Sequence, residues 1–392
     1  MATTYAPPAQ QNMRSGTLLD KLGMLTILAI CFVAPWGTFR QFAPLLTFAT
    51  VPILLLAALV AFRLMAKGNR LEPFDALILP ILFIVAASSL WSDFIPAWDE
   101  HAFWYFASAV TYLGVRLFLR NAGDLRSIAT VSALGGFVAI AMIEPGQPSL
   151  EFGGGILRPG VPGHNSNFTA YSLVGAIFLL LTVARHLTKN RIERVAAFAA
   201  CAVLFYGILY LDTRGALISV GLMALWYIVS SWGLGKVAHL AVWPAFAFTM
   251  LFSLGLLEWV GPAVEALVPS DRQSGDLSGR IPTWQTARAL IGEDPLLGVG
   301  PGGFEILSPY GIGAHNLFLT LALDLGLIGL ALFMLLLTRG LWRGLIADGT
   351  EADKSFVTLF ACYFLPIAAT GHFEVAPFTW VVLATTFSAL RD

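Results

Sequence analysis

The chain has 392 residues, of which 57% are hydrophobic and only 12% are charged. A soluble domain carries about a quarter charged residues, so this composition indicates an integral membrane protein and excludes an ordinary soluble enzyme. The formal net charge of −1 argues against a nucleic-acid partner. The three cysteines (Cys31, Cys201 and Cys362) all lie in apolar runs, which argues against a disulfide framework and against a cysteine metal site.

Twelve mostly apolar runs are long enough for a spanning helix, which needs about 20 residues. They begin near residues 21, 42, 74, 101, 125, 167, 194, 213, 236, 314, 354 and 373. We therefore predict an all-α polytopic membrane protein of about 12 transmembrane helices with one large loop containing short helices. In this scheme residues 1–20 are a cytoplasmic tail, 21–260 carry helices 1–9, 261–313 form the loop, and 314–392 carry helices 10–12. The first run has no clean cleavage site and predicts a retained helix, not a signal peptide.

Basic residues predict the orientation of these helices. With the N-terminus inside, 17 of the 23 lysines and arginines lie in inner segments. Inner loops carry an excess of basic residues, so both termini are expected in the cytoplasm and the 261–313 loop outside. The remaining six are all arginines: Arg40, Arg158, Arg214, Arg272, Arg280 and Arg288. An arginine kept on the depleted side needs a reason, and its planar, permanently charged guanidinium suits phosphate oxygens.

A histidine opens the tenth run, in the sequence AHNLFLTLALDLGLIGL. We expect His315 in the first turn of that helix, where the positive end of the helix dipole favours the neutral imidazole. A neutral imidazole can accept a proton from an attacking hydroxyl, so His315 is a candidate catalytic base. Its neighbour Asn316 is a candidate substrate-binding residue. The alternative for both is a structural role at the helix start or at the membrane interface, and the residues alone leave it open.

Arg214 lies in the sequence LYLDTRGALISV, just inside the outer end of the eighth run. An arginine in a spanning segment is costly and usually faces a polar interior. The adjacent Gly215 permits the close approach of another helix or of a ligand, which favours anion binding. The alternative is a salt bridge to Asp212, or an arginine that extends to the membrane interface.

Arg280, Trp284 and Arg288 recur at every fourth position in SGRIPTWQTARAL. If this piece is helical from about Pro282, a favourable first-turn residue, the three share one face. Two guanidinium groups on one stripe would clamp a diphosphate, with Trp284 between them. The alternative is an amphipathic helix that lies on the membrane and points its basic residues toward lipid headgroups.

Two further segments supply polar groups on the same side. His164, in GHNSNFTAY, is a candidate second polar group of the site, although it could equally cap the sixth helix beside ordinary N-cap residues. GVGPGGF at 298–304 has no preceding strand and no following Lys-Ser/Thr, so it predicts a tight turn and not a nucleotide loop. No acidic pair has metal-binding spacing, and we expect neither a metal nor a cofactor.

Four short motifs in this order resemble those of the bacterial O-antigen ligase family, in the superfamily that also contains O-antigen and exopolysaccharide polymerases. They are SSLWSDFIPAW, LDTRGA, SGRIPTW followed by DPLLGVGPGGF, and AHNLFL with GLIG. The resemblance covers most of the chain. It implies a multi-pass glycosyltransferase of the bacterial inner membrane, with residues 261–313 as a periplasmic loop and the active site facing the periplasm.

The resemblance also implies substrates and roles. The donor would be a glycan linked to undecaprenyl diphosphate, and the acceptor a sugar hydroxyl of lipid A–core, within the membrane lipids. His315 would be the base or the orienting group for that hydroxyl, and Arg214 and Arg280 would hold the diphosphate leaving group. Arg288 and Arg158 are given the same task by position alone. One direct displacement of this kind is metal-independent and inverts the anomeric carbon.

Three other functions stay open from the sequence. A polymerase of the same superfamily would join repeat units to one another, and a protein O-oligosaccharyltransferase would use a protein acceptor. The latter is less expected, because the sequence ends directly after the last predicted helix. A twelve-helix transporter belongs to another class, but its site would lie near the bilayer midplane, whereas the candidate residues here lie at outer helix ends.

Overall fold

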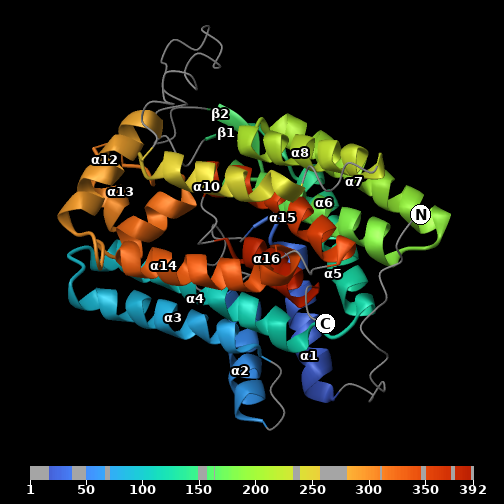
Figure 1. The fold of residues 1–392 in the computed structure, drawn as a ribbon, viewed down its shortest axis with the longest axis horizontal. Helices are drawn as coiled ribbons and strands as arrows, with labels where there is room; N and C mark the ends of the chain where they lie inside the picture. Colours follow the sequence, from blue (N-terminus) through green and yellow to red (C-terminus); the bar gives the residue numbers. More distant parts are fainter. Residues whose placement is uncertain are drawn as a thin grey trace, which may run out of the picture.

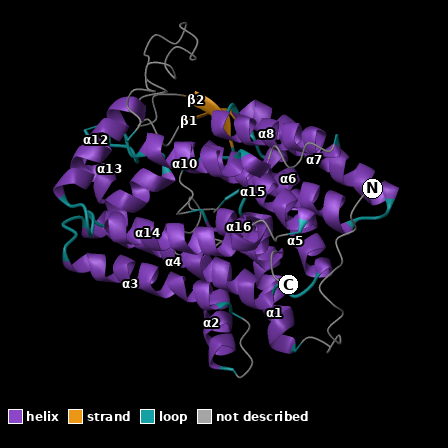
Figure 2. Ribbon diagram, in the orientation of Figure 1, coloured by secondary structure: helices purple, strands orange, loops and turns teal. Residues whose placement is uncertain are grey.

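The structure is a computed structural model that describes residues 17–37, 50–66, 71–148, 157–162, 164–232, 239–256, 280–309, 311–345, 350–371 and 376–389. Helices make up most of this part of the chain (Figure 1). One antiparallel two-stranded sheet lies at an edge of the molecule, as Figure 2 shows. Its strands are β1 (Glu144–Pro148) and β2 (Leu157–Gly160), with Gln147 opposite Arg158.

The helices follow the apolar runs of the sequence. The first eight are α1 (Leu18–Val33), α2 (Thr50–Met65), α3 (Ile78–Ala87), α4 (Ile95–Phe118), α5 (Ala122–Ala141), α6 (Ser166–Thr182), α7 (Arg191–Leu211) and α8 (Arg214–Ser231). The later ones are α10 (Val242–Ser253), α12 (Arg280–Glu293), α13 (Gly303–Leu307), α14 (Leu317–Leu345), α15 (Glu351–Thr370) and α16 (Pro377–Ala389). Each of the twelve predicted runs contains one of these helices, and α12 and α13 lie in the predicted loop.

Length and composition identify seven segments that could cross a membrane: Pro73–Leu90, Ala122–Ala141, Ser166–Leu187, Arg191–Leu211, Arg214–Ser231, Leu317–Trp342 and Glu351–Thr370. Thr50–Met65, Pro244–Ser253 and Pro377–Ala389 are apolar but shorter. The prediction of a polytopic, all-α membrane protein is therefore confirmed. The count of twelve spans, the domain boundaries and the periplasmic position of the loop stay predictions.

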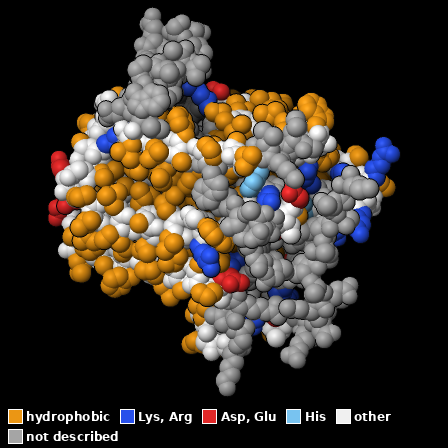
Figure 3. Space-filling model, viewed as in Figure 1, with side chains coloured by type: hydrophobic (Ala, Val, Ile, Leu, Met, Phe, Trp, Pro, Cys, Tyr) orange, Lys and Arg blue, Asp and Glu red, His pale blue; other side chains and the backbone are white. Residues whose placement is uncertain are grey.

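The core is organised around α6, the most buried of the seven candidate spans. It packs against α5, α7, α8, α15 and α16, while α4 packs against α16 and α2 on the other side of the molecule. Outward-facing side chains are apolar as well, for example Tyr206 and Leu225 on α7 and α8. Figure 3 shows a broad face covered by hydrophobic side chains, as expected for a surface that contacts lipid tails.

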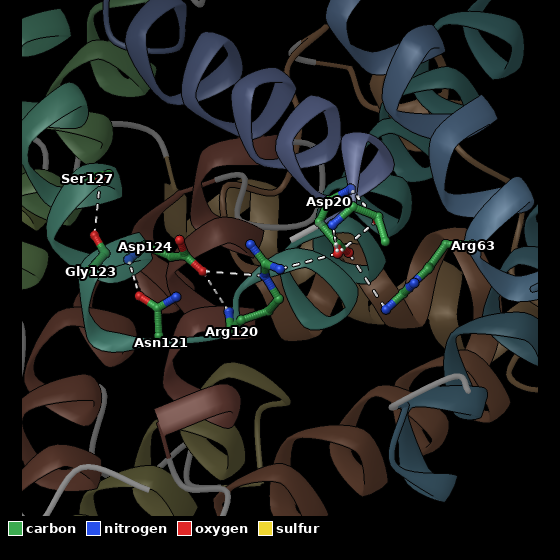
Figure 4. Close-up of polar contacts among 8 residues, drawn as sticks. Asp20, Arg63, Arg120, Asn121, Gly123, Asp124 and Ser127 are labelled. Carbon is green, nitrogen blue, oxygen red and sulfur yellow. Dashed lines mark hydrogen bonds and ion pairs between the residues drawn. The ribbon is translucent and has the colours of Figure 1, made fainter. Parts of the chain in front are cut away.

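Charged residues at the helix ends predicted to lie inside connect α1, α2, α4 and α5 (Figure 4). Thr17 and Asp20 form a capping box at the start of α1, and Asp20 also lies 3.2 Å from Arg120 and 3.7 Å from Arg63. Asp124 in turn accepts a hydrogen bond from the Arg120 backbone N–H. These residues come from three different inner segments of the predicted topology, and the structure brings them to one end of the bundle.

A fully buried ion pair lies farther into the same half of the bundle. Arg116 on α4 donates to both carboxylate oxygens of Asp75, at 2.9 and 3.1 Å, and to Ser388 Oγ at 3.2 Å. Tyr112 donates to the same carboxylate. The hydrogen bonds from both partners compensate the cost of burying the charges, and they join α4 to the turn before α3 and to α16.

The predicted tenth helix is broken. Within α14, Gly326 has φ 67° and ψ −177°, a backbone conformation that only glycine adopts readily. The loop between α12 and α13 occupies the break: Val299 N donates to Leu323 O at 2.7 Å, and Leu327 N donates to Pro295 O at 2.8 Å. The 19 residues from Leu327 to Leu345 extend about 28 Å, enough for a span on their own. Residues 317–325 are therefore available to shape a site.

Candidate active site at the last turn of α15

The end of α10, the side of α12 and the start of α14 meet at the last turn of α15, the end predicted to lie outside. Asn316 is fully buried at the centre of this junction. Its Nδ2 donates to Ser253 Oγ on α10 at 2.8 Å and to the Ala369 carbonyl on α15 at 3.4 Å. Its Oδ1 accepts from the backbone N–H groups of Phe318 and Leu319, at 3.1 and 3.2 Å. Asn316 is thus the N-cap of α14 and a bridge to two other helices.

His315 lies just outside α14, and the expectation that it occupies the first helical turn is wrong. The helix begins at Leu317, because Asn316 uses its side chain as the cap and the residue before a cap is not helical. His315 has φ 49°, one of two non-glycine residues with positive φ in the described chain, and is 5% exposed. Strained left-handed residues of this kind gather at functional sites.

The Trp284–Arg288 stripe of α12 is helical, as predicted, but it faces the protein. Trp284 is 6% exposed, and its indole Nε1 donates to the Ala314 carbonyl at 2.8 Å. Arg288 donates from Nε to Ser253 O at 3.1 Å and from Nη2 to Phe252 O at 2.9 Å. A guanidinium on the last carbonyls of α10 neutralises the negative end of that helix. These contacts give Arg288 a structural role in the junction.

Arg214 is the first residue of α8 and is exposed. The chain turns sharply before it, since Asp212 has φ 49°, and Thr213 Oγ1 donates to Asn167 Oδ1 of α6 at 3.3 Å. Gly215 packs so tightly on the Thr370 side chain that a Cβ there would overlap its Oγ1. The prediction that Gly215 permits a close helix approach is confirmed, and the approaching helix is α15.

The last turn of α15 is the point at which these groups come together. Ala369 accepts from Asn316, and the next residue, Thr370, packs on Gly215 beside Arg214. The Thr370 carbonyl also accepts from the Tyr171 hydroxyl of α6 at 3.1 Å. Two helix N-termini, those of α8 and α14, therefore meet one helix C-terminus. Arg214 and His315 are thus next to residues that contact this turn, and Arg288 is linked to it through Ser253 and Asn316.

His164 lies beside the end of α1. Its imidazole packs against Gly37, which has φ 76°, and its ring centroid is 6.3 Å from that of Phe168. Burial lowers the pKa of His164 to about 4, so the ring is neutral at pH 7. The contacts place it against α1 and not against the α15 junction, and its role as a second polar group stays a prediction.

Two predicted arginines are located only by their backbone. Arg158 lies on β2, opposite Gln147, in a hairpin that packs against α6 and α7. Arg280 is the first residue of α12, two turns before Arg288. The side chains of both lie outside the described part of the structure, and so does Arg272.

The glycine-rich loop at 298–304 is a series of tight turns, as predicted, and it packs on the SSLWSD motif. Gly298, Gly300 and Gly302 all have positive φ. The Gly298 carbonyl accepts from Trp91 Nε1 at 3.1 Å. This contact joins two of the motifs that carry the family resemblance, although 207 positions separate them.

Sequence reasoning missed two polar contacts that hold this loop. His101 Nε2 lies 3.4 Å from Glu305 Oε1, which ties α13 to α4. Tyr105, one turn farther along α4, donates to Asp324 of α14 at 2.9 Å. The four-residue spacing of His101 and Tyr105 predicts only that the two side chains share one face of a helix. It does not identify their partners, which lie about 200 positions later in the sequence.

Comparison with known proteins identifies one family that part of this chain resembles. Residues 197–334 match the family model described as O-antigen ligase. The matched segment contains Arg214, Arg280, Arg288, His315 and Asn316, and it ends before α15. Arg158 and His164 lie outside it. No curated protein matches the chain closely enough to count as a relative. The match supports the resemblance of this membrane protein to the O-antigen ligase superfamily over residues 197–334.

Proposed function

We propose that the chain is an O-antigen ligase, which moves a glycan from undecaprenyl diphosphate to a sugar hydroxyl of lipid A–core. The superfamily consists of glycosyltransferase-like enzymes, and the ligase is one of its activities. The observation that carries the proposal is the convergence at the end of α15: the start of α8, which carries the exposed Arg214, and the start of α14, next to the buried His315, both contact its last turn. Both lie at the side predicted to face the periplasm, in the inner membrane.

The donor requires a group that stabilises the departing diphosphate. Arg214 is suited to this task, because its guanidinium is exposed and stands at the positive end of the α8 dipole. Charge grows on the diphosphate as the glycosidic bond breaks, so a positioned guanidinium stabilises the transition state more than the ground state. Arg280 and Arg158 are proposed to assist. Arg288 is proposed to act indirectly, by holding the end of α10 in place.

The acceptor requires a group that receives a proton. His315 is proposed to take the proton of the sugar hydroxyl as its oxygen forms a bond to the anomeric carbon. The bonding pair of the old glycosidic bond leaves with the diphosphate, and the anomeric carbon inverts. The guanidinium groups of Arg214, Arg280 and Arg158 would supply the positive charge that a metal ion supplies elsewhere, so the proposed reaction needs no metal.

The polymerase of the same superfamily is the nearest rival, and it would use the same leaving-group chemistry with another glycan as acceptor. A transporter is disfavoured by the polar contacts at the α14 break. There the loop backbone pairs with Leu323 and Leu327, so these two backbone groups are used within the protein and do not line a substrate path.

Reconstitution separates these functions. The purified protein is placed in proteoliposomes with a lipid-linked glycan and lipid A–core, with a metal chelator present, and products are resolved by mass spectrometry. Transfer to lipid A–core supports the ligase. Glycan elongation without a lipid A–core product would identify a polymerase, and solute flux without a glycosidic product would identify a transporter.

Arg214 offers a matched control for the leaving-group role. Arg214→Ala should lower kcat by about 10- to 1,000-fold if the guanidinium stabilises the departing charge. Arg191 is also an exposed arginine at the first position of a helix, α7, but it lies at the end of the bundle predicted to face the cytoplasm. Arg191→Ala should therefore leave turnover unchanged. Equal effects of the two substitutions would contradict the proposed role of Arg214.

A further inference from the structure

We propose that Trp284 is a positioning residue for His315: its indole N–H holds the carbonyl that precedes the histidine and so fixes where the imidazole points. The catalytic consequence depends on the proposed function, in which His315 receives the acceptor proton. The structural part of the proposal, that Trp284 fixes the local backbone, does not depend on it.

The contact itself is short and enclosed. Trp284 Nε1 donates to the Ala314 carbonyl at 2.8 Å, across 30 positions of sequence. Trp284, Ala314 and Phe304 belong to one small apolar cluster with Leu319 and Leu323 of α14. The ring also meets Phe252 of α10 edge-on, with centroids 6.1 Å apart. A hydrogen bond screened from water in this way resists exchange with solvent, so the Ala314 carbonyl has one fixed direction.

The backbone conformation of His315, the residue after Ala314, depends on the direction of that carbonyl. His315 has φ 49°, a conformation that a residue with a side chain avoids by about 1–2 kcal/mol unless neighbours impose it. On the far side, Asn316 is held by Ser253, by Ala369 and by the first N–H groups of α14. With Ala314 held from α12 and Asn316 held from α10, α14 and α15, the backbone of His315 is fixed from both sides.

Trp284 therefore does not act as the ring between two diphosphate-binding arginines, because its N–H and its ring are both used inside the junction. Arg288, one turn later, supports the same arrangement through the carbonyls of Phe252 and Ser253. The stripe that the sequence predicts for phosphate contact instead aligns the histidine. A small displacement of a catalytic group is known to reduce rates by about 100-fold per Å.

The test removes the N–H and keeps the ring. Trp284→Phe preserves an aromatic contact with Phe252 but cannot donate to Ala314. Replacing Trp284 with β-(3-benzothienyl)alanine by nonsense suppression keeps the full ring shape and removes only the donor. The control is Trp226→Phe, since Trp226 on α8 is also buried (3% exposed) but contacts Arg185 and lies outside the junction.

Two readouts are measured on the full chain in proteoliposomes. In both Trp284 variants kcat should fall about 10- to 100-fold with the donor KM unchanged, because the imidazole is displaced and the diphosphate contacts are not. The second readout is the rate at which diethyl pyrocarbonate modifies His315, followed by mass spectrometry. His315 is 5% exposed and should react slowly in the wild type and at least several-fold faster in the variants.

The outcomes separate the two proposals. Wild-type turnover and unchanged His315 protection in the benzothienyl variant would overturn the positioning role of Trp284. Faster modification of His315 in the Trp284 variants, together with a wild type that transfers no glycan, would support the positioning role and refute the proposed ligase. If Trp284→Phe and Trp226→Phe lose activity and His315 protection equally, Trp284 contributes packing alone and the proposal is wrong.

Discussion

The break in α14 predicts a large effect of a small substitution, Gly326→Ala. A Cβ at this position would overlap the carbonyl oxygen and carbon of Leu296, which are backbone atoms and cannot move aside without moving the loop. The φ of 67° with ψ of −177° adds about 1–3 kcal/mol for any residue with a side chain. Displacing the loop also removes the hydrogen bonds from Val299 to Leu323 and from Leu327 to Pro295, at about 1 kcal/mol each. Together these terms should lower the free energy of unfolding of Gly326→Ala by about 3–5 kcal/mol.

Gly221 on α8 provides the control, because a Cβ there meets nothing within 4 Å. Gly221→Ala should stabilise the protein by up to about 1 kcal/mol, since alanine is the better helix former. The two variants are compared by reversible unfolding in mixed detergent micelles, followed by tryptophan fluorescence. The loop that enters the break also joins α12 to α13, so Gly326→Ala should reduce glycosyl transfer and expose residues 294–302 to protease. If the two variants are equally stable and equally resistant to protease, the contacts at the break do not hold the loop.

Three further predictions follow from single polar groups. Asn316→Ser keeps a good N-cap residue but cannot reach Ser253, so the lost bridge should lower the free energy of unfolding by about 1–3 kcal/mol. Asn316→Ala also loses the cap and should lower it by about 1 kcal/mol more in the same unfolding assay. Asp75→Asn leaves Arg116 buried and without its counter-charge, and should cost about 3–5 kcal/mol; an effect below 1 kcal/mol would show that the ion pair is not buried in the membrane-embedded protein. Burial lowers the pKa of His164 to about 4, below its ordinary value of 6.5, so the unfolded chain binds a proton first and stability falls as pH drops from about 6.5 to 4. The loss should reach about 2 kcal/mol at pH 5 and should be absent in His164→Phe, as stability curves at pH 7 and pH 5 would show.

The helix positions follow from local properties and could be read from the sequence. Apolar runs of about 20 residues predict helices, and a helix lies in each of the twelve runs. Glycines at 298, 300 and 302 predict a turn, which positive φ values confirm. The match of residues 197–334 supports the resemblance, and it contains three of the four short motifs that suggest it.

The start of α14 shows where local reasoning ends. An apolar run that follows His315 predicts a helix there, but the first helical residue depends on which side chain caps it. Asn316 takes that place because Ser253 and Ala369 hold its amide group from two other helices. His315 is consequently left outside the helix, in a left-handed conformation that its own sequence does not require.

The sequence by itself determined that this is a helical membrane protein and that the basic residues on its predicted outer side are all arginines. It also determined that Trp284 and Arg288 share one face of a helix. Spacing of 3.6 residues per turn fixes that face, but it does not say what the face meets. Only the tertiary structure turned it toward Ala314 and the end of α10, and only tertiary contacts brought Arg214 and Asn316 to the same turn of α15. Those contacts join residues 30 to 155 positions apart, and no local pattern encodes such a pairing.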